Sequence, residues 1–136
     1  MLERIAPTPA SPQTAQVTRA EAGAGVRAVV RLFSAWELSE EDACDLLGGI
    51  SRSTWRRWKA GTVAKVDRDL AARLSLLLGI HKGLRYLFTD PAQGYRWIRK
   101  PNQAFAGQSA LEVMRGGSVF ALERVRRYLD AERGGW

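Results

Sequence analysis

The sequence predicts an all-α fold of about seven short helices, and three observations support this prediction. Apolar residues recur at helical spacing, and no segment alternates between apolar and polar residues as a half-buried strand does. Ser, Thr or Asp precedes each helical segment at the N-cap position. Glycine or proline separates most of the segments. The 136 residues, 46% of them apolar, suffice for a modest core and exclude a wholly disordered chain.

A polar arm and one helix come first. Residues 1–17 contain three prolines and no apolar period, so we expect a flexible arm there. The sequence turns helical at Thr18, because Thr18 and Glu21 have the spacing of a capping box. Gly23 and Gly25 weaken the first turns, so a later start of this helix stays open.

Two short helices follow, joined by a glycine turn. Ser39 caps the first helix, and the acidic residues behind it suit the positive end of the helix dipole. Gly48 and Gly49 end this helix. Ser51 caps the next helix, which carries two inward tryptophans and ends at Gly61. The segment is therefore predicted to form a tight helical hairpin.

The C-terminal half begins with a longer, leucine-rich helix. Asp67 is its predicted cap, and Gly79 and Gly83 are expected to bend or divide it. A short helix over residues 91–98 and two further helices are expected after it. Each of these follows a capping residue, namely Asp90, Ser109 and Ser118.

Charge is distributed unevenly along the helical hairpin. The whole chain has 21 Lys and Arg against 14 Asp and Glu, a net charge of +7. Residues 36–50 contain five acids and no base, whereas residues 52–68 contain six bases and one acid. A supporting helix followed by a basic helix is the order of a helix-turn-helix, in which the second helix enters the major groove of DNA. The pattern therefore favours DNA binding.

The outward side chains of the basic helix are the candidate DNA contacts. Arg can pair bidentately with guanine, Ser can bond bases or phosphates, and Lys suits phosphates. We expect base contacts from Ser51, Arg52, Ser53, Arg56 and Arg57, and phosphate contacts from Lys59, Lys65 and Arg68. The turn at Gly48 and Gly49 adds one residue to the common motif, which leaves the angle of the second helix open. An ordinary helical hairpin with a solvated basic face is the alternative.

Cysteine and histidine usage excludes several kinds of site. The single cysteine, Cys44, and the single histidine, His81, cannot form an internal disulfide or a closed zinc site. His81 has no evident catalytic partner in the sequence, so an enzyme is the least favoured function and no cofactor is expected. No apolar run approaches the roughly 20 residues of a membrane span, and no signal peptide opens the chain. We therefore expect a cytoplasmic protein without a membrane partner.

Several short motifs, taken in order, resemble a known family over about residues 26–136. They are SRSTWRRWKAG, the leucine-rich helix, Trp97-Ile98, the Pro101-Asn102 loop, Phe105 with Gly107, the helix over residues 109–117 and the RGGW ending. This arrangement resembles the Xre/MbcA/ParS class of antitoxins from bacterial toxin–antitoxin operons. Ala110 departs from it, because relatives often carry Pro just after the capping Ser.

The resemblance implies a two-part antitoxin behind the flexible arm. Residues 18–66 would form the Xre-like helix-turn-helix region for DNA binding and dimerisation, and residues 67–136 the helical toxin-binding domain. The implied partner is a RES-domain toxin that depletes NAD⁺, into whose active site the C-terminal end of the antitoxin is placed. The implied assembly contains a homodimer within a larger toxin–antitoxin complex, which binds operator DNA and represses its own operon.

The C-terminal end has residue types that suit a segment inserted into the active site of a toxin. Gly134 and Gly135 permit backbone conformations that other residues resist, and Trp136 is a large aromatic anchor. Arg133 adds a charge that could pair inside a polar cleft, and Arg126 of the last helix joins the expected toxin contacts. A frayed helix end without a role is the alternative.

A second function from another class stays open at this point. A stand-alone helix-turn-helix transcription regulator would use the C-terminal half only for dimerisation or ligand sensing. The presence or absence of a toxin partner separates these two functions.

Overall fold

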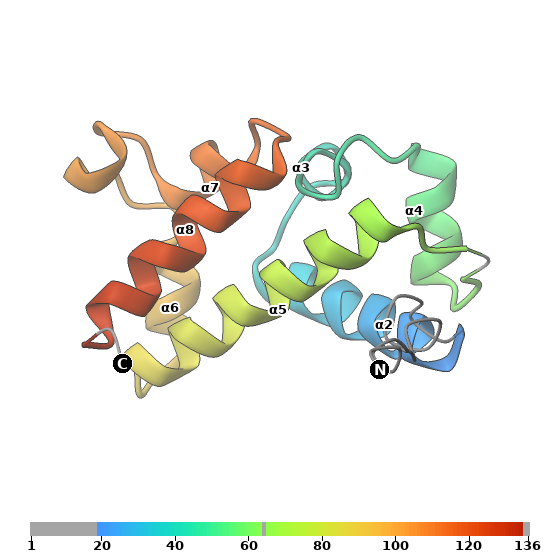
Figure 1. Ribbon diagram of the computed structural model, residues 1–136, viewed down its shortest axis with the longest axis horizontal. Helices are drawn as coiled ribbons and strands as arrows, with labels where there is room; N and C mark the ends of the chain where they lie inside the picture. Colours follow the sequence, from blue (N-terminus) through green and yellow to red (C-terminus); the bar gives the residue numbers. More distant parts are fainter. Residues whose placement is uncertain (1–18, 64, 135–136) are drawn as a thin grey trace, which may run out of the picture.

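The computed structural model describes residues 19–63 and 65–134, and these residues form seven α-helices, one 3₁₀ helix and no β-strand (Figure 1). The helices are α2 (Arg19–Ala35), α3 (Glu40–Leu46), α4 (Arg52–Lys59), α5 (Arg68–Leu87), α6 (Pro91–Trp97), α7 (Ala110–Met114) and α8 (Val119–Glu132). The all-α prediction is confirmed. The expected arm, residues 1–17, and Thr18 lie outside the described residues. No helix in the described part is long and apolar enough to cross a membrane.

Local capping chemistry sets where the helices begin. The predicted cap side chains accept a backbone hydrogen bond from the first turn at Ser39, Ser51, Asp67, Asp90, Ser109 and Ser118. At Ser109 the bond is reciprocal, since Glu112 accepts from the Ser109 backbone N–H at 2.8 Å. Each cap satisfies an amide that the helix itself leaves unpaired. Ser, Asp and their spacing thus fix the boundaries before any tertiary packing.

Helix α5 lies at the centre of the molecule. Figure 1 shows α2, α3 and α4 around its N-terminal half, α6 and α8 beside its C-terminal half, and α7 next to the start of α8. Contrary to the expectation of a divided helix, α5 runs unbroken through Gly79 and Gly83. These glycines instead permit close packing against α8. A Cβ atom at position 79 would overlap the guanidinium of Arg126, and one at position 83 would lie 3.3 Å from the Cβ of Leu129.

Aromatic side chains build the core on the N-terminal side. Phe33 and Trp36 stack with ring centroids 5.9 Å apart, and Trp55 packs 5.7 Å from Phe33 and 6.5 Å from Trp58. All four side chains are buried, as is the Cys44 thiol beside them in the core. Because α4 contributes two of these tryptophans, its opposite face has to point to solvent.

A second aromatic cluster holds the C-terminal side together. Trp97 stacks on Tyr128 at 5.9 Å and meets Phe105 edge-on at 6.4 Å, while Phe105 and Tyr128 lie 5.2 Å apart. Such pairs contribute about 0.5–1.5 kcal/mol each beyond the area that they bury. The cluster joins α6 and the 3₁₀ helix Gln103–Phe105 to α8, which follows later in the sequence.

Two arginines from the C-terminal half hold the start of the helical hairpin. Arg99 donates from Nη2 to the backbone carbonyls of Trp36, at 2.6 Å, and Glu37, at 3.1 Å, beyond the end of α2. Arg115, which follows α7, pairs with Asp42 in α3 at 2.9 Å. The position of α3 relative to the C-terminal half is therefore set by directed polar contacts as well as by the shared core.

Candidate functional site

The α3–α4 hairpin presents the basic helix with its tryptophans inward. Trp55 and Trp58 are 4% and 3% exposed, respectively. Ser53 lies on the opposite side of α4, and Arg56 and Arg57 flank it. Every side chain predicted to contact DNA is exposed, namely those of Ser51, Arg52, Ser53, Arg56, Arg57, Lys59, Lys65 and Arg68.

The glycine turn between the two helices packs against a side chain of α5. Gly48 and Gly49 both have left-handed backbone angles, with φ of +85° and +88°. The guanidinium of buried Arg73 lies directly against Gly48, where a Cβ atom would approach Arg73 Nε to 2.7 Å. Arg73 is held there by Asp69, whose carboxylate accepts from Nε at 2.9 Å. The angle between α3 and α4 is therefore fixed against α5.

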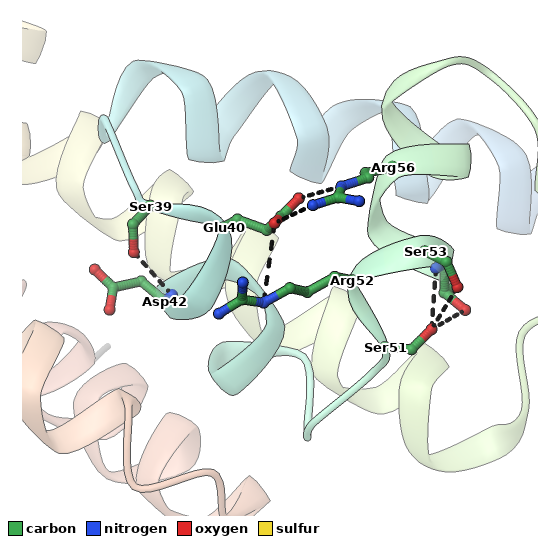
Figure 2. Close-up of polar contacts among 8 residues, drawn as sticks. Ser39, Glu40, Asp42, Ser51, Arg52, Ser53 and Arg56 are labelled. Atoms are coloured by element: carbon green, nitrogen blue, oxygen red, sulfur yellow. Dashed lines mark hydrogen bonds and ion pairs between the residues drawn. The ribbon is translucent and has the colours of Figure 1, made fainter.

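Glu40 pairs with the arginines on one side of α4 (Figure 2). Its two carboxylate oxygens accept from Nε and Nη2 of Arg56 at 2.9 and 3.0 Å, a bidentate contact. Arg52 Nε lies 3.9 Å from the same carboxylate. The hydrogen bond from Arg56 is the main cause that lowers the pKa of Glu40, and the same bond raises the pKa of Arg56. At neutral pH, Glu40 therefore stays ionised and offsets part of the charge of this face.

Arg57, on the other side of α4, is held by hydroxyl groups instead. Ser51 Oγ accepts from the backbone N–H of Thr54 at 3.0 Å and donates to Thr54 Oγ1 at 3.0 Å. Arg57 Nη2 in turn donates to Thr54 Oγ1 at 3.2 Å. No carboxylate of the described residues lies within 4.0 Å of Arg57. Arg57 therefore carries uncompensated positive charge beside exposed Ser53.

The two lysines lie apart from Arg57. Lys59 lies over the Trp55 ring, with Nζ 6.0 Å from its centroid, and lines a cavity of about 350 Å³ that Glu40 also lines. Lys65 is exposed in the segment between α4 and α5. The structure thus groups Arg52, Arg56 and Lys59 on the Glu40 side and leaves Lys65 beyond the helix.

Sequence reasoning missed Glu40 and Thr54 as parts of this site. The available signals were the spacing of Thr54 and Arg57 by three residues, which places them on one helix face, and an acidic helix start ahead of an Arg-rich helix. The second signal was interpreted only as a dipole effect. Which arginine pairs with Glu40 depends on the angle between α3 and α4, and this angle cannot be predicted from the spacing of residues in the sequence.

At the C-terminal end, the predicted toxin contacts follow one face of α8. Arg133, which caps α8, lies over the exposed ring of Tyr86 with 4.2 Å from guanidinium carbon to ring centroid. Gly134 follows with a left-handed φ of +96°. Arg126 lies two turns earlier, against Gly79 of α5 and 3.5 Å from Asp130. Tyr86 was not predicted as part of this site, and Gly135 and Trp136 lie outside the described residues.

Phe120 is the other large apolar side chain on the described surface. Tyr128 stacks in the second aromatic cluster, whereas Phe120 is 73% exposed in the first turn of α8. The Phe120 side chain is therefore not part of the core of this chain.

Comparison with known proteins identifies both halves of the chain. Residues 15–79 match the Xre-like helix-turn-helix domain of antitoxins, and residues 83–135 match the C-terminal toxin-binding domain of the Xre/MbcA/ParS antitoxins. The chain is also similar to the uncharacterized protein y4oB of Sinorhizobium fredii, at 46% identity over 114 residues that cover 82% of this chain and 86% of the relative. With both matches in this order, the chain belongs to the Xre/MbcA/ParS antitoxin family and has a helix-turn-helix domain followed by a toxin-binding domain.

Proposed function

We propose that this antitoxin neutralises a RES-domain toxin that depletes NAD⁺ by placing its C-terminal end in the toxin active site. The observation that carries the proposal is the toxin-binding match, which extends to residue 135. The described chain ends at exposed Gly134, where Arg133 is fixed over Tyr86. A fixed base followed by two glycines and a terminal tryptophan suits a segment that enters a cleft.

Neutralisation can be tested by co-expressing the antitoxin with the RES-domain toxin of its operon and measuring cellular NAD⁺ and growth. Removal of residues 133–136 is expected to abolish protection, and Trp136→Ala is expected to weaken it. Phe120→Ala is the matched control, since it removes an aromatic side chain that is exposed in the first turn of α8. Full protection by the truncated antitoxin, at an equal level of folded protein, would refute the proposal that the C-terminal end blocks the toxin active site.

We also infer that the α4 face binds operator DNA and that the pair represses its own operon. Arg57 and Ser53 suit base contacts, because Arg57 has no carboxylate partner in the described chain and both are exposed. Arg52 and Arg56 would reach DNA while Glu40 fixes their direction. Helix-turn-helix proteins commonly read two half-sites as a dimer, so we expect a homodimer within the toxin–antitoxin complex.

DNA binding is tested by fluorescence anisotropy on DNA from upstream of the operon, alone and with the toxin. A two-fold-symmetric footprint with a dimer mass in sedimentation supports the inference. Specific DNA binding with no stoichiometric toxin partner from the native cytoplasm would instead favour the stand-alone regulator. Toxin binding without any DNA binding would refute the inferred operator binding and leave toxin neutralisation as the function of the protein.

A further inference from the structure

A cavity of about 260 Å³ lies between α2, α5 and α6, away from the α4 face. Alanine and leucine side chains of α2 and α5 form its apolar surface. Its polar groups are Arg31 from α2, His81 and Arg85 from α5, and Tyr95 from α6. The volume is just below the roughly 300–1,000 Å³ of pockets for drug-sized ligands, so the cavity suits a smaller molecule.

The positive charge beside this cavity is not balanced by any carboxylate among its described lining residues, since none of them is Asp or Glu. Within the described chain, neither Arg31 nor Arg85 has a carboxylate within 4.0 Å. Both side chains are exposed, in contrast to buried Arg73, which pairs with Asp69. Two guanidinium groups beside one concave surface are therefore available to an external anion.

His81, which lines the same cavity, has an unpaired polar atom. Its Nδ1 is buried and has no hydrogen-bond partner in the described structure, although nearly all buried polar groups in proteins have one. Burial, and to a smaller extent the charge of Arg85, lower the pKa of His81. Arg31 and Tyr95 face it across the cavity from α2 and α6. The imidazole is thus held neutral at physiological pH, next to cations and without a partner.

We propose that this cavity binds a small organic carboxylate. The guanidinium groups of Arg31 and Arg85 pair with the carboxylate, and the imidazole of His81 and the hydroxyl of Tyr95 offer further hydrogen bonds. The compact apolar body of the ligand lies against Leu32 and the neighbouring alanines. An apolar surface with a few convergent polar groups is the usual composition of a small-molecule site. The residues that line this cavity are not among the proposed toxin and DNA contacts, so its occupancy can be measured without either partner.

The single histidine makes the test direct, because its imidazole resonances in NMR need no assignment by mutation. The full-length protein is titrated with benzoate, and with benzyl alcohol as a neutral probe of similar shape. Benzoate is expected to shift the His81 resonances saturably and to raise the pKa of His81, since a bound anion stabilises the imidazolium. Benzyl alcohol is expected to produce no saturable shift.

Variants locate the binding. The double substitution Arg31→Gln and Arg85→Gln is expected to weaken benzoate binding at least about tenfold, whereas exposed Lys82→Gln leaves it unchanged. Unfolding temperature and circular dichroism verify that each variant is folded. If the double variant does not fold, the two single substitutions are measured in its place. No saturable shift with benzoate, equal shifts with both probes, or unchanged binding in folded arginine variants would each overturn the proposal.

Discussion

The glycine turn offers a matched pair of substitutions, because Gly48 and Gly49 have nearly the same backbone angle but different surroundings. Alanine at either position adopts a left-handed conformation, at a cost of about 1–2 kcal/mol. At Gly49 nothing lies within 4 Å of the new Cβ atom. At Gly48 it would lie 2.7 Å from Arg73 Nε and 2.8 Å from Arg73 Cζ, so the guanidinium has to move away from Asp69.

Gly48→Ala is expected to lower the free energy of unfolding more than Gly49→Ala does, because only Gly48→Ala displaces Arg73. A hydrogen bond to a charged group contributes about 1.5–3 kcal/mol, and the exposure of Asp69 places this one at the lower end. Gly48→Ala is therefore expected to unfold roughly 5 °C below Gly49→Ala. In an Arg73→Ala background the two substitutions are expected to cost the same, which makes a double-mutant cycle by urea unfolding the decisive measurement. Equal stabilities in the wild-type background, or a difference that persists without Arg73, would refute the contact.

Three further outcomes are expected. Glu40→Gln leaves Arg56 uncompensated, so DNA affinity at low salt should rise and the salt slope of anisotropy titrations should steepen by about 1; an unchanged slope contradicts this. Lys59→Ala should weaken binding to all DNA sequences and flatten the salt slope by about 1. Arg57→Ala should instead reduce discrimination between operator and unrelated DNA. If the two variants behave alike, the division into base and phosphate contacts is wrong. Burial raises the pKa of Cys44, so its alkylation by iodoacetamide at pH 8 should be slower than that of free cysteine and should equalise in denaturant.

Helix boundaries could be predicted from the sequence because they depend on neighbours a few residues away. Ser39, Ser51 and Ser109 each bond an amide three residues on, and this chemistry is readable in the chain. Gly48 and Gly49 end α3 in left-handed conformations that glycine adopts readily. Apolar spacing likewise placed Trp55 and Trp58 in the core, so the exposed face of α4 followed.

Features that join distant elements could not be predicted in this way. Glu40 and Arg56 are sixteen residues apart, and their contact depends on how α3 and α4 cross. Gly79 was expected to bend or divide α5 because of its local propensity, whereas in the structure its missing side chain leaves room for the guanidinium of Arg126. The cavity around His81 is assembled from three helices, and no segment alone contains its charge pattern.

Helix α5 also has a consequence for how the two halves of the molecule unfold. It is a rod of 20 residues, about 30 Å long, and the two family matches meet within it, between residues 79 and 83. Each half of the molecule therefore uses part of the same helix as a wall of its core. Unfolding that starts from the C-terminal end would unwind this shared wall, so the toxin-binding domain and the helix-turn-helix domain would be lost as a single event.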